Sequence, residues 1–355
     1  MYSVSKHLLF YFKNGQFTGE NYLTGKLTVL STNVLQIVRY VSDVYRSMEE
    51  IKEKFKGVPD IEKLITDLTE AGILTEKTSE RAKQEKVLEE WEWDLPARYY
   101  HARTHYVNFE ANNEKVWAEL DQKAGSEPPP EPYITLPDVT YRPLPPPSGN
   151  LNYNIFRSLL ERRTCRAFLA VPITEQELSD CMYYSFGKTG EYKGGSLGDV
   201  IFKTSPSGGS RHHPEVYAVI NRVQNLESGI YHYHLHTHSL GMLHKGDFSQ
   251  WATRACSEQK WVTNCSAVFI ITSLLKRNMW KYRHAHAYRV IQLDIGHLAQ
   301  TFNLTCTAMR LASFGTAALN NTLIEEKLKI HPYRQPAMYV TAVGHPDKND
   351  PAYAR

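Results

Sequence analysis

The sequence predicts an α+β fold in which a small winged-helix-like domain precedes a larger sandwich domain. Three short helical patterns lie within the first eighty residues, whereas strand-like and helical runs alternate through the second half of the chain. Nine of the eighteen prolines fall within residues 126–149 and separate these two regions. We therefore expect three segments, which cover residues 1–80, 81–150 and 151–355.

The helices of the first segment carry start and stop signals. Ser31 or Thr32 can cap the first helix, and Ser47 with Glu50 has the spacing of a capping box at the start of the second. Gly72 follows the third helix and favours a left-handed stop. A strand pattern comes directly after it, and three short helices with a hairpin predict a winged helix.

The charge of the third helix argues against DNA binding by this winged helix. Asp60, Glu62, Asp67 and Glu70 outnumber the single Lys63. A helix of this charge repels phosphates. Two alternatives remain open: the domain captures the leader segment of a peptide by strand addition at a sheet edge, or it serves only as a scaffold.

The middle segment combines a charged helical pattern with a proline-rich stretch. The helical pattern covers residues 79–90, and residues 126–149 are too rich in proline for regular secondary structure. We expect an extended arm here. It either wraps a partner subunit or forms a disordered spacer.

The third segment contains the elements of the sandwich. Strand patterns cover residues 216–220, 268–272 and 338–343. A long helix is expected over residues 287–311, and its apolar residues cover more than one side, which predicts burial at a dimer interface. We expect His297 and Gln300 on this helix to be core polar groups with partners rather than ligands.

Four histidines alternate with other residues in the run from His232 to His238. On a strand they would share one face. Because no acidic residue or cysteine joins them, we expect a solvated hairpin face and no metal site.

Composition limits the remaining function classes. The 355 residues are 42% hydrophobic and 22% charged, enough for a large core, and the net charge of +3 shows no basic cluster for nucleic acid. Five scattered cysteines imply neither a disulfide framework nor a zinc site, which fits a reducing cytoplasm. No signal peptide or membrane-spanning apolar run is present, so we expect a cytoplasmic protein without a membrane partner.

Two short motifs suggest a binding site for a polar ligand. The loop Ser205-Pro206-Ser207-Gly208-Gly209 lies between two strand patterns, where glycines allow close backbone approach and serines offer small donors. The second motif, Arg162-Arg163-Thr164-Cys165-Arg166, follows a helix pattern capped by Asn154 and suits an anion.

Together with a turn expected at residues 313–318, these motifs resemble the flavin nitroreductase superfamily. Within it, the chain is most similar to the SagB-type dehydrogenases, which include the azoline oxidases of ribosomal peptide biosynthesis, such as cyanobactin oxidases. The resemblance covers about residues 150–347 and rests on the motifs Ser205–His212, Gly229–Tyr233, Lys281–Arg283 and Asp294–Gln300.

The resemblance implies a nitroreductase-like sandwich, FMN as the cofactor and a homodimer. Arg162 would hold the phosphate with Lys348 or Arg355, and Thr164 and Arg166 would contact the ribityl chain and the pyrimidine edge. The residues implied at the cofactor are Arg162, Arg163, Thr164, Arg166, Ser205, Pro206, Ser207, Gly208, Gly209, Gly315, Thr316, Ala317, Lys348 and Arg355.

The resemblance also implies a reaction. Lys281 and Tyr282 are similar to the Lys-Tyr pair that removes the α-proton in azoline oxidases, while a hydride passes to flavin N5. A nearby ammonium would lower the pKa of the tyrosine. Neighbouring residues share no face of a helix or strand, so cooperation requires an irregular backbone here.

We therefore expect an FMN-dependent enzyme that oxidises thiazoline or oxazoline rings of a ribosomally made peptide, with oxygen as the final acceptor. A cyclodehydratase would be a partner. Two alternatives are a small-molecule flavin oxidoreductase that uses NAD(P)H, acting on nitro or quinone compounds, and a non-catalytic leader-binding protein.

Overall fold

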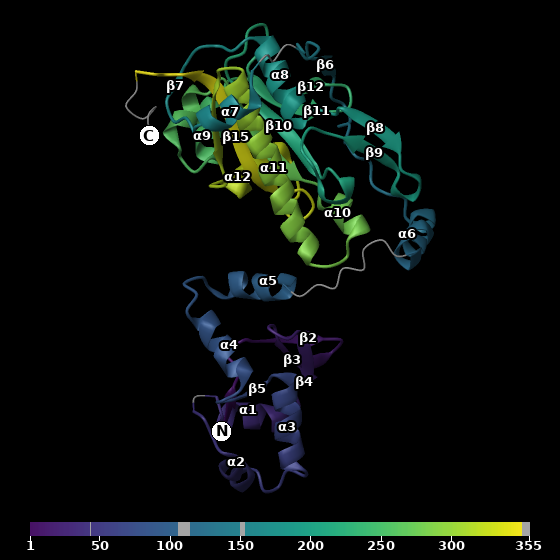
Figure 1. Cartoon of the computed structure of the whole chain (residues 1–355), viewed down its shortest axis with the longest axis vertical. Helices are drawn as coiled ribbons and strands as arrows, with labels where there is room; N and C mark the ends of the chain where they lie inside the picture. The colour runs from purple at the N-terminus through teal and green to yellow at the C-terminus, as the bar shows by residue number, and fades with distance from the viewer. Residues whose placement is uncertain (43, 106–113, 150–152, 350–355) are drawn as a thin grey trace. The chain divides into compact units, whose positions relative to one another are not determined.

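The computed structural model describes residues 1–42, 44–105, 114–149 and 153–349 (Figure 1). The chain divides into two compact units, residues 1–109 and 110–355. The expected middle segment is therefore not a separate body. Its first part, with α4 (Glu80–Glu89) and α5 (Leu95–His105), belongs to the first unit, and its proline-rich part belongs to the second.

The first unit is built from short elements around a small core. Its elements are β1 (Tyr2–Val4), β2 (Leu8–Lys13), β3 (Gln16–Asn21), β4 (Lys26–Val29), α1 (Thr32–Tyr40), α2 (Met48–Lys54), α3 (Ile61–Ala71) and β5 (Leu74–Glu76), followed by α4 and α5. Ser31 caps α1, Ser47 and Glu50 form the capping box of α2, and Gly72 ends α3 with a left-handed φ of 81°.

The hairpin of this unit precedes the helices instead of following them. Asn14 and Gly15 both have positive φ and connect β2 to β3, which is the backbone that a tight hairpin requires. β3 also pairs with β4, while β5 pairs with β1 at the start of the chain. The expected wing after α3 is thus replaced by a strand pair that closes the unit.

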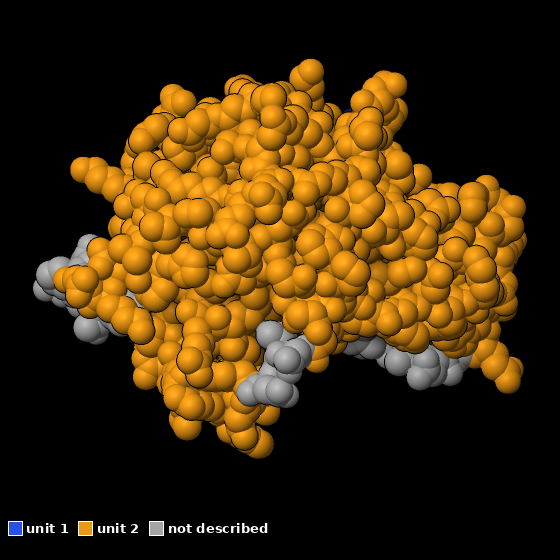
Figure 2. Space-filling model, turned by 90° about the horizontal axis from the view of Figure 1, so that it is seen from above, with its two compact units in different colours: residues 1–109 blue, residues 110–355 orange. Residues whose placement is uncertain are grey.

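The second unit contains an antiparallel sheet with helices on both faces (Figure 1). Figure 2 shows one face of the surface of this unit. Its helices are α6 (Glu114–Ser126), α7 (Ile155–Glu161), α8 (Glu175–Phe186), α9 (Ser249–Ala255), α10 (Leu275–Lys281), α11 (His286–Ala308) and α12 (Asn321–Leu328). Its strands are β6 (Tyr141–Pro143), β7 (Phe168–Leu169), β8 (Gly190–Lys193), β9 (Asp199–Phe202), β10 (Pro214–Ile220), β11 (Gly229–His234), β12 (Ser239–Lys245), β13 (Ala267–Ser273), β14 (Ala312–Thr316) and β15 (Ala337–Pro346).

The main sheet has the order β14-β15-β13-β10-β11-β12-β6, and β7 also pairs with β15. Side chains alternate between its two faces: Val216 and Ala218 of β10 join a cluster with α8 and α11, whereas Tyr217 and Val219 join one with α9 and α12. The predicted α+β class is therefore confirmed. β8 and β9 form a separate hairpin beside the sheet.

The proline-rich arm packs against its own chain, so the expected disordered spacer was wrong, and contact of the arm with a partner subunit stays a prediction. Tyr141–Pro143 form β6, which pairs with β12 at the sheet edge. Arg277 Nε donates to the Glu131 carbonyl at 2.7 Å, and Trp280 Nε1 donates to the Glu127 carbonyl at 2.8 Å. These two backbone carbonyls accept hydrogen bonds from side chains of α10. The hydrogen bonds hold the arm in place although it forms only one short strand.

The expectation of a solvated histidine face was wrong, because this arm covers it. His232 and His234 are buried. His232 Nδ1 lies 2.9 Å from the Tyr141 hydroxyl, and His234 Nε2 lies 2.8 Å from Thr135 Oγ1. Among the described residues no group of three or more His, Cys, Asp or Glu side chains is arranged to hold a metal ion.

The long helix α11 buries only one side within a single chain. Ile291, Ile295 and Phe302 belong to the core, but the opposite side exposes Leu293, His297 and Gln300. The prediction that His297 and Gln300 are core polar groups was therefore wrong. Dimer burial of this side remains a prediction.

Candidate functional site

The Ser-Gly loop is attached to α11 by one buried carboxylate. Ser207 Oγ donates to Asp294 Oδ2 at 2.6 Å, and the Gly208 N–H lies 3.1 Å from the same oxygen. His213 Nε2 lies 3.4 Å from it. Burial would raise the pKa of Asp294, but His213 and Ser207 hold that pKa below its ordinary value. The loop is thus organised around an anion that the protein itself supplies.

The serine hydroxyls of this loop point into the protein rather than toward an open site. Ser205 Oγ lies 2.6 Å from Thr301 Oγ1, and Ser207 is engaged by Asp294. Contrary to the sequence-based expectation, these hydroxyls are not available as donors to a ligand. Only backbone groups and the surface of Pro206 remain for a flat ring.

Tyr282 lies directly against the second glycine of the loop. Gly209 has a φ of 62°, and a Cβ built on it would fall within contact distance of the Tyr282 hydroxyl. Gly208 approaches Val290 of α11 in the same way. Both glycines are therefore required by close packing, and the loop and the Lys-Tyr pair form one cluster.

The backbone at the Lys-Tyr pair is irregular, as cooperation between the two residues requires. α10 ends at Lys281, and Tyr282 has extended dihedrals of −118° and 109°. Lys281 Nζ lies 5.3 Å from the centre of the Tyr282 ring and 5.8 Å from the centre of the Trp117 ring. The ammonium therefore contacts ring faces, and no hydrogen bond to the tyrosine hydroxyl is formed.

This geometry reverses the expected effect on the tyrosine. Burial raises the pKa of Tyr282 above its ordinary value, although Arg211 opposes the shift. Burial, followed by Arg211, lowers the pKa of Lys281. The tyrosine is thus a neutral phenol near pH 7, and the lysine is the group of the pair that loses its proton more readily than usual.

Arg211 is a site residue that the motif contained but that our sequence interpretation did not single out. Its side chain is buried, Nε donates to the Gly209 carbonyl at 3.1 Å, and Nη1 donates to the Leu197 carbonyl at 3.3 Å. Arg211 therefore fixes the loop and places a positive charge beside Lys281 and Tyr282.

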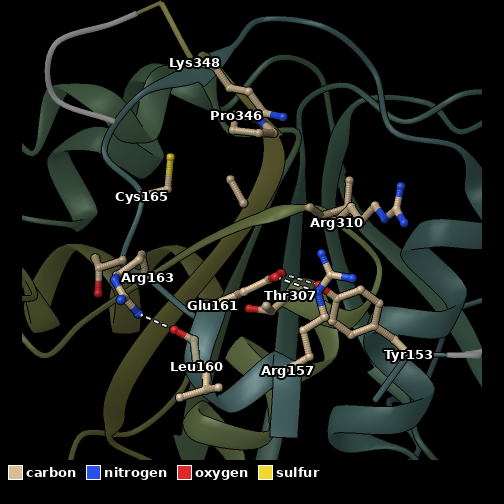
Figure 3. A pocket seen from close by; sticks show the side chains of 13 residues that line it. Tyr153, Arg157, Leu160, Glu161, Arg163, Cys165, Thr307, Arg310, Pro346 and Lys348 are labelled. Atoms are coloured by element: carbon tan, nitrogen blue, oxygen red, sulfur yellow. Dashed lines mark hydrogen bonds and ion pairs between the residues drawn. The ribbon is translucent and has the colours of Figure 1, made fainter. Parts of the chain in front are cut away.

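A second cluster forms a cationic cavity of about 750 Å³ at the other end of α11 (Figure 3). Lys348, Arg163, Arg157 and Arg310 contribute cations to its wall, and Glu161 contributes a carboxylate. The remaining lining residues are Tyr153, Leu160, Thr164, Cys165, Thr307, Leu311, Ala312 and Pro346. Four cations against one carboxylate, with two threonines, make a donor set that suits a phosphate group.

The carboxylate in this cavity is already occupied by neighbours. Arg157 Nε donates to Glu161 Oε1 at 2.6 Å, and the Tyr153 hydroxyl donates to Glu161 Oε2. Arg163 donates to the carbonyls of Leu160 and Arg162. Arg310 and Lys348 remain as cations for which the described residues offer no hydrogen bond or ion pair.

The other implied cofactor residues lie outside this cavity. Arg162 follows α7 as its C-cap, and the Arg166 guanidinium lies 5.6 Å from the centre of the Trp261 ring. The Arg-x-Thr-x-Arg run nevertheless lies beside residues 313–318, because Thr164 and Ser313 form an isolated parallel β-bridge. Arg355 lies outside the described residues.

Residues 313–316 form part of β14 rather than the expected turn. A Cβ at Gly315 would fall 2.9 Å from the Tyr339 hydroxyl, so the glycine permits close packing. Thr316 Oγ1 accepts from Gln259 Nε2 at 3.1 Å, and Ala317 is exposed just after the strand. The backbone remains extended because β15 pairs with it along its length.

The Lys-Tyr pair and the cationic cavity lie near opposite ends of α11. Gly208, beside that pair, contacts Val290 and Asp294, and Ser205 reaches Thr301, whereas the cavity is lined by Thr307 and by Arg310, which follows the helix. Val290 and Thr307 are seventeen residues apart, or about 25 Å along the helix axis at 1.5 Å per residue. Within one chain, the Lys-Tyr pair and the cationic cavity therefore lie far apart.

The sequence profile of the nitroreductase family matches residues 159–345, more than half of the chain. The chain belongs to the nitroreductase family. The match begins within α7 and ends within β15, so it includes the Ser-Gly loop and α11 and most of the cavity lining.

Two curated relatives each match a little under half of the chain. A protein of Methanocaldococcus jannaschii that is named as a nitroreductase is 29% identical over 49% of this chain and 84% of its own length. The trifolitoxin-processing protein TfxB of Rhizobium leguminosarum bv. trifolii is 29% identical over 44% of this chain, and the match covers 43% of TfxB.

A solved structure from Anabaena variabilis, also named as a nitroreductase, has the same fold. It superimposes with a TM-score of 0.50 at 24% identity and covers 59% of this chain and 42% of that chain. The chain thus spans less than half of the length of TfxB and of the Anabaena protein. Among the described residues, no helix combines the length and apolar content that crossing a membrane requires.

Sequence interpretation missed several residues of both clusters. Asp294 belonged to a quoted motif but had no assigned role, and its spacing to the loop serines cannot be read from the chain. Arg157 and Arg310 follow no motif at all. Arg310 follows the C-terminus of α11, where the helix dipole alone would explain a positive charge, whereas Arg157 lies in the first turn of α7 and no signal in the sequence marks it.

Proposed function

We propose that this protein is an FMN-dependent dehydrogenase that oxidises thiazoline or oxazoline rings in a ribosomally made peptide to the aromatic azoles. Membership of the nitroreductase family supports an oxidoreductase, and the relative TfxB is named for the processing of trifolitoxin. The observation that carries the proposal is the packing of Tyr282 against Gly209, which joins the Lys-Tyr pair to the Ser-Gly loop.

The donor set of the cationic cavity fits the phosphate of FMN. Arg163, Arg310 and Lys348 would neutralise the dianion, and Thr164 would donate a hydroxyl hydrogen bond. The backbone of Gly208 and Gly209, with Pro206, would line the ring. When bound, FMN would accept the hydride from the azoline β-carbon, and oxygen would carry the electrons away as hydrogen peroxide.

The residues of the chain would manage the proton. The lowered pKa of Lys281 favours this amine as acceptor of the azoline α-proton, while neutral Tyr282 donates a hydrogen bond to the substrate. Both side chains are half-buried between Trp117 and the loop, which would limit the access of water to the transfer. The positive charge of Arg211 would disfavour the ammonium form of Lys281. Lys281 would therefore readily release the proton that it has taken from the azoline.

A homodimer would bring the two clusters together. Within a single chain α11 keeps the Lys-Tyr pair and the cationic cavity apart. In a dimer the loop of one protomer would meet the cationic cavity of its partner. Apolar surface is available for this contact: Phe156 and Leu160 of α7 are 71% and 75% exposed, and Leu293 of α11 is 57% exposed. Gly296 lies on the same exposed side, where a missing side chain allows close approach.

The first unit offers a surface for a leader peptide. β4 is an edge strand that pairs with β3 on one side, and its Leu27 and Val29 are exposed. Strand addition at this edge would place a peptide's apolar side chains on these two residues. A cyclodehydratase would act before this enzyme, because it must supply the azoline ring.

The test combines cofactor identification with substrate turnover. Purified protein should be yellow and release FMN on denaturation, and a peptide that contains thiazoline should lose two hydrogens with formation of hydrogen peroxide. Arg310→Gln with Lys348→Gln should lose FMN, whereas Arg142→Gln, remote from the cavity lining, should retain it. Pyridine-nucleotide turnover on nitro compounds without azoline oxidation would favour the small-molecule alternative.

A further inference from the structure

A second cavity, of about 400 Å³, opens where α10 leads into α11. Its wall is mainly apolar and includes Leu275, Met279, Ala287 and Ile291. Tyr282 lies in the same wall and also contacts Gly209 of the loop. The cavity is therefore adjacent to the Lys-Tyr pair and separate from the cationic cavity.

One polar side chain in this wall has unsatisfied hydrogen-bonding groups. Asn278 is 0% exposed, and neither its Nδ2 nor its Oδ1 has a hydrogen-bond partner among the described residues. A buried carboxamide in this state is unfavourable, and the great majority of such groups in proteins are paired. Neighbouring polar groups on α10 do have partners: Arg277 binds Glu215, and the Trp280 indole binds the arm.

The unpaired groups of Asn278 define the chemistry of a matching ligand. The carboxamide offers one donor group and one acceptor, and a secondary amide presents the complementary pair. An ester lacks the N–H and satisfies only the donor side. The apolar walls favour a hydrocarbon side chain beside that amide, and a volume of about 400 Å³ accommodates a single residue with its flanking peptide bonds.

We propose that this cavity binds one apolar residue of the substrate peptide, next to the ring that is oxidised, and that Asn278 hydrogen-bonds its peptide bond. The role as a substrate site rests on the proposed function, but the affinity for an amide does not. A peptide bond held by Asn278 would lie one helical turn from Tyr282, so the adjacent ring is presented to the Lys-Tyr pair.

The probes are N-methyl-4-methylpentanamide, which carries a single secondary amide on a leucine-like chain, and its ester analogue, methyl 4-methylpentanoate. Dissociation constants measured by ligand-observed NMR on the full chain should favour the amide by about tenfold, the value of one or two net hydrogen bonds. Asn278→Leu should remove this preference. Asn264→Leu, an exposed position outside the cavity lining, should retain it.

Thermal unfolding separates binding from a structural role. If the carboxamide is unpaired in the free protein, Asn278→Leu should unfold at the same or a higher temperature than the wild type. The proposal is overturned if the wild type binds both probes equally, or if Asn278→Leu retains the preference. Should that variant fail to fold, Asn278→Ala, which removes both polar groups at a smaller volume, must lose the amide preference instead.

Two further results would also overturn the proposal. An ordered water that satisfies Asn278 and is retained with the amide bound would show that the cavity needs no ligand. Amide binding that appears only on dilution to monomers would show that a second copy fills the cavity. Failure of the proposed function is distinct, since azoline oxidation would then be absent from a wild type that still prefers the amide.

Discussion

Ser207 Oγ donates a 2.6 Å hydrogen bond to Asp294 Oδ2, which ties the Ser-Gly loop to the middle of α11. Asp294→Asn should therefore detach the loop. The new amide would direct N–H groups toward donors on Ser207, Gly208 or His213 and would lose the charge that holds them. We expect a loss of about 2–3 kcal/mol of stability, measured by urea unfolding. Asp199→Asn, in an exposed ion pair, should change it by less than about 0.5 kcal/mol.

Gly209→Ala should displace the Tyr282 side chain. The added methyl group would overlap the tyrosine hydroxyl, and the positive φ of Gly209 adds backbone strain. Part of this cost should disappear when Tyr282 is replaced by Phe. A double-mutant cycle by thermal unfolding should give a coupling of about 1 kcal/mol. Strictly additive effects would mean that the two residues do not touch in solution.

The proposed proton transfer predicts a pH dependence for oxidation. Since Lys281 must be deprotonated to accept a proton, kcat/KM should rise with pH through the lysine pKa, which burial and Arg211 hold below its ordinary value. Arg211→Gln should move this rise to higher pH, while Arg211→Lys should leave it in place. Lys281→Met should abolish turnover and retain bound FMN. A rate that falls with rising pH in this range would contradict the assignment.

Acid should destabilise the second unit below about pH 6.5. Burial lowers the pKa of His212 to about 3, with Lys203 as the next cause. Between these two pKa values the histidine remains neutral in the folded protein, whereas the same histidine in the unfolded chain takes up a proton. Stability is therefore full above about pH 6.5 and declines from there to about pH 3, by about 1.4 kcal/mol per pH unit for one such residue.

His212→Asn should reduce that slope, and asparagine suits the positive φ of this position. Urea unfolding at several pH values measures the effect. The same substitution at exposed His331 provides the control. An unchanged slope in His212→Asn would assign the acid sensitivity to other buried histidines.

The fold was largely predictable because its signals are local. The strand patterns at residues 216–220, 268–272 and 338–343 lie within β10, β13 and β15, and the long helix begins one residue earlier and ends three residues before its expected stop. The Ser47 capping box and the Gly72 stop were confirmed. The spacing of hydrophobic residues and the capping residues of a helix depend only on neighbours in the sequence, so both can be read from the sequence of one chain.

Features that depend on distant partners were not predictable. The proline-rich arm returns to cover His232 and His234 of β11, and the arm itself is held by Arg277. The pKa of Tyr282 is raised because its side chain is partly buried, and Lys281 contacts its ring face instead of its hydroxyl. Each of these outcomes is decided by which segment packs where, and no local pattern contains that information.

The pairing of β6 with β12 also protects the protein from aggregation. β6 is the last strand on that side of the sheet, and Pro143 within it has no N–H to offer a further strand. Prolines continue at residues 145–147, which keeps the neighbouring backbone from extending the ladder. If residues 126–149 were deleted, the longer β12 would become an open edge with unpaired backbone groups, and chains would be able to associate through it.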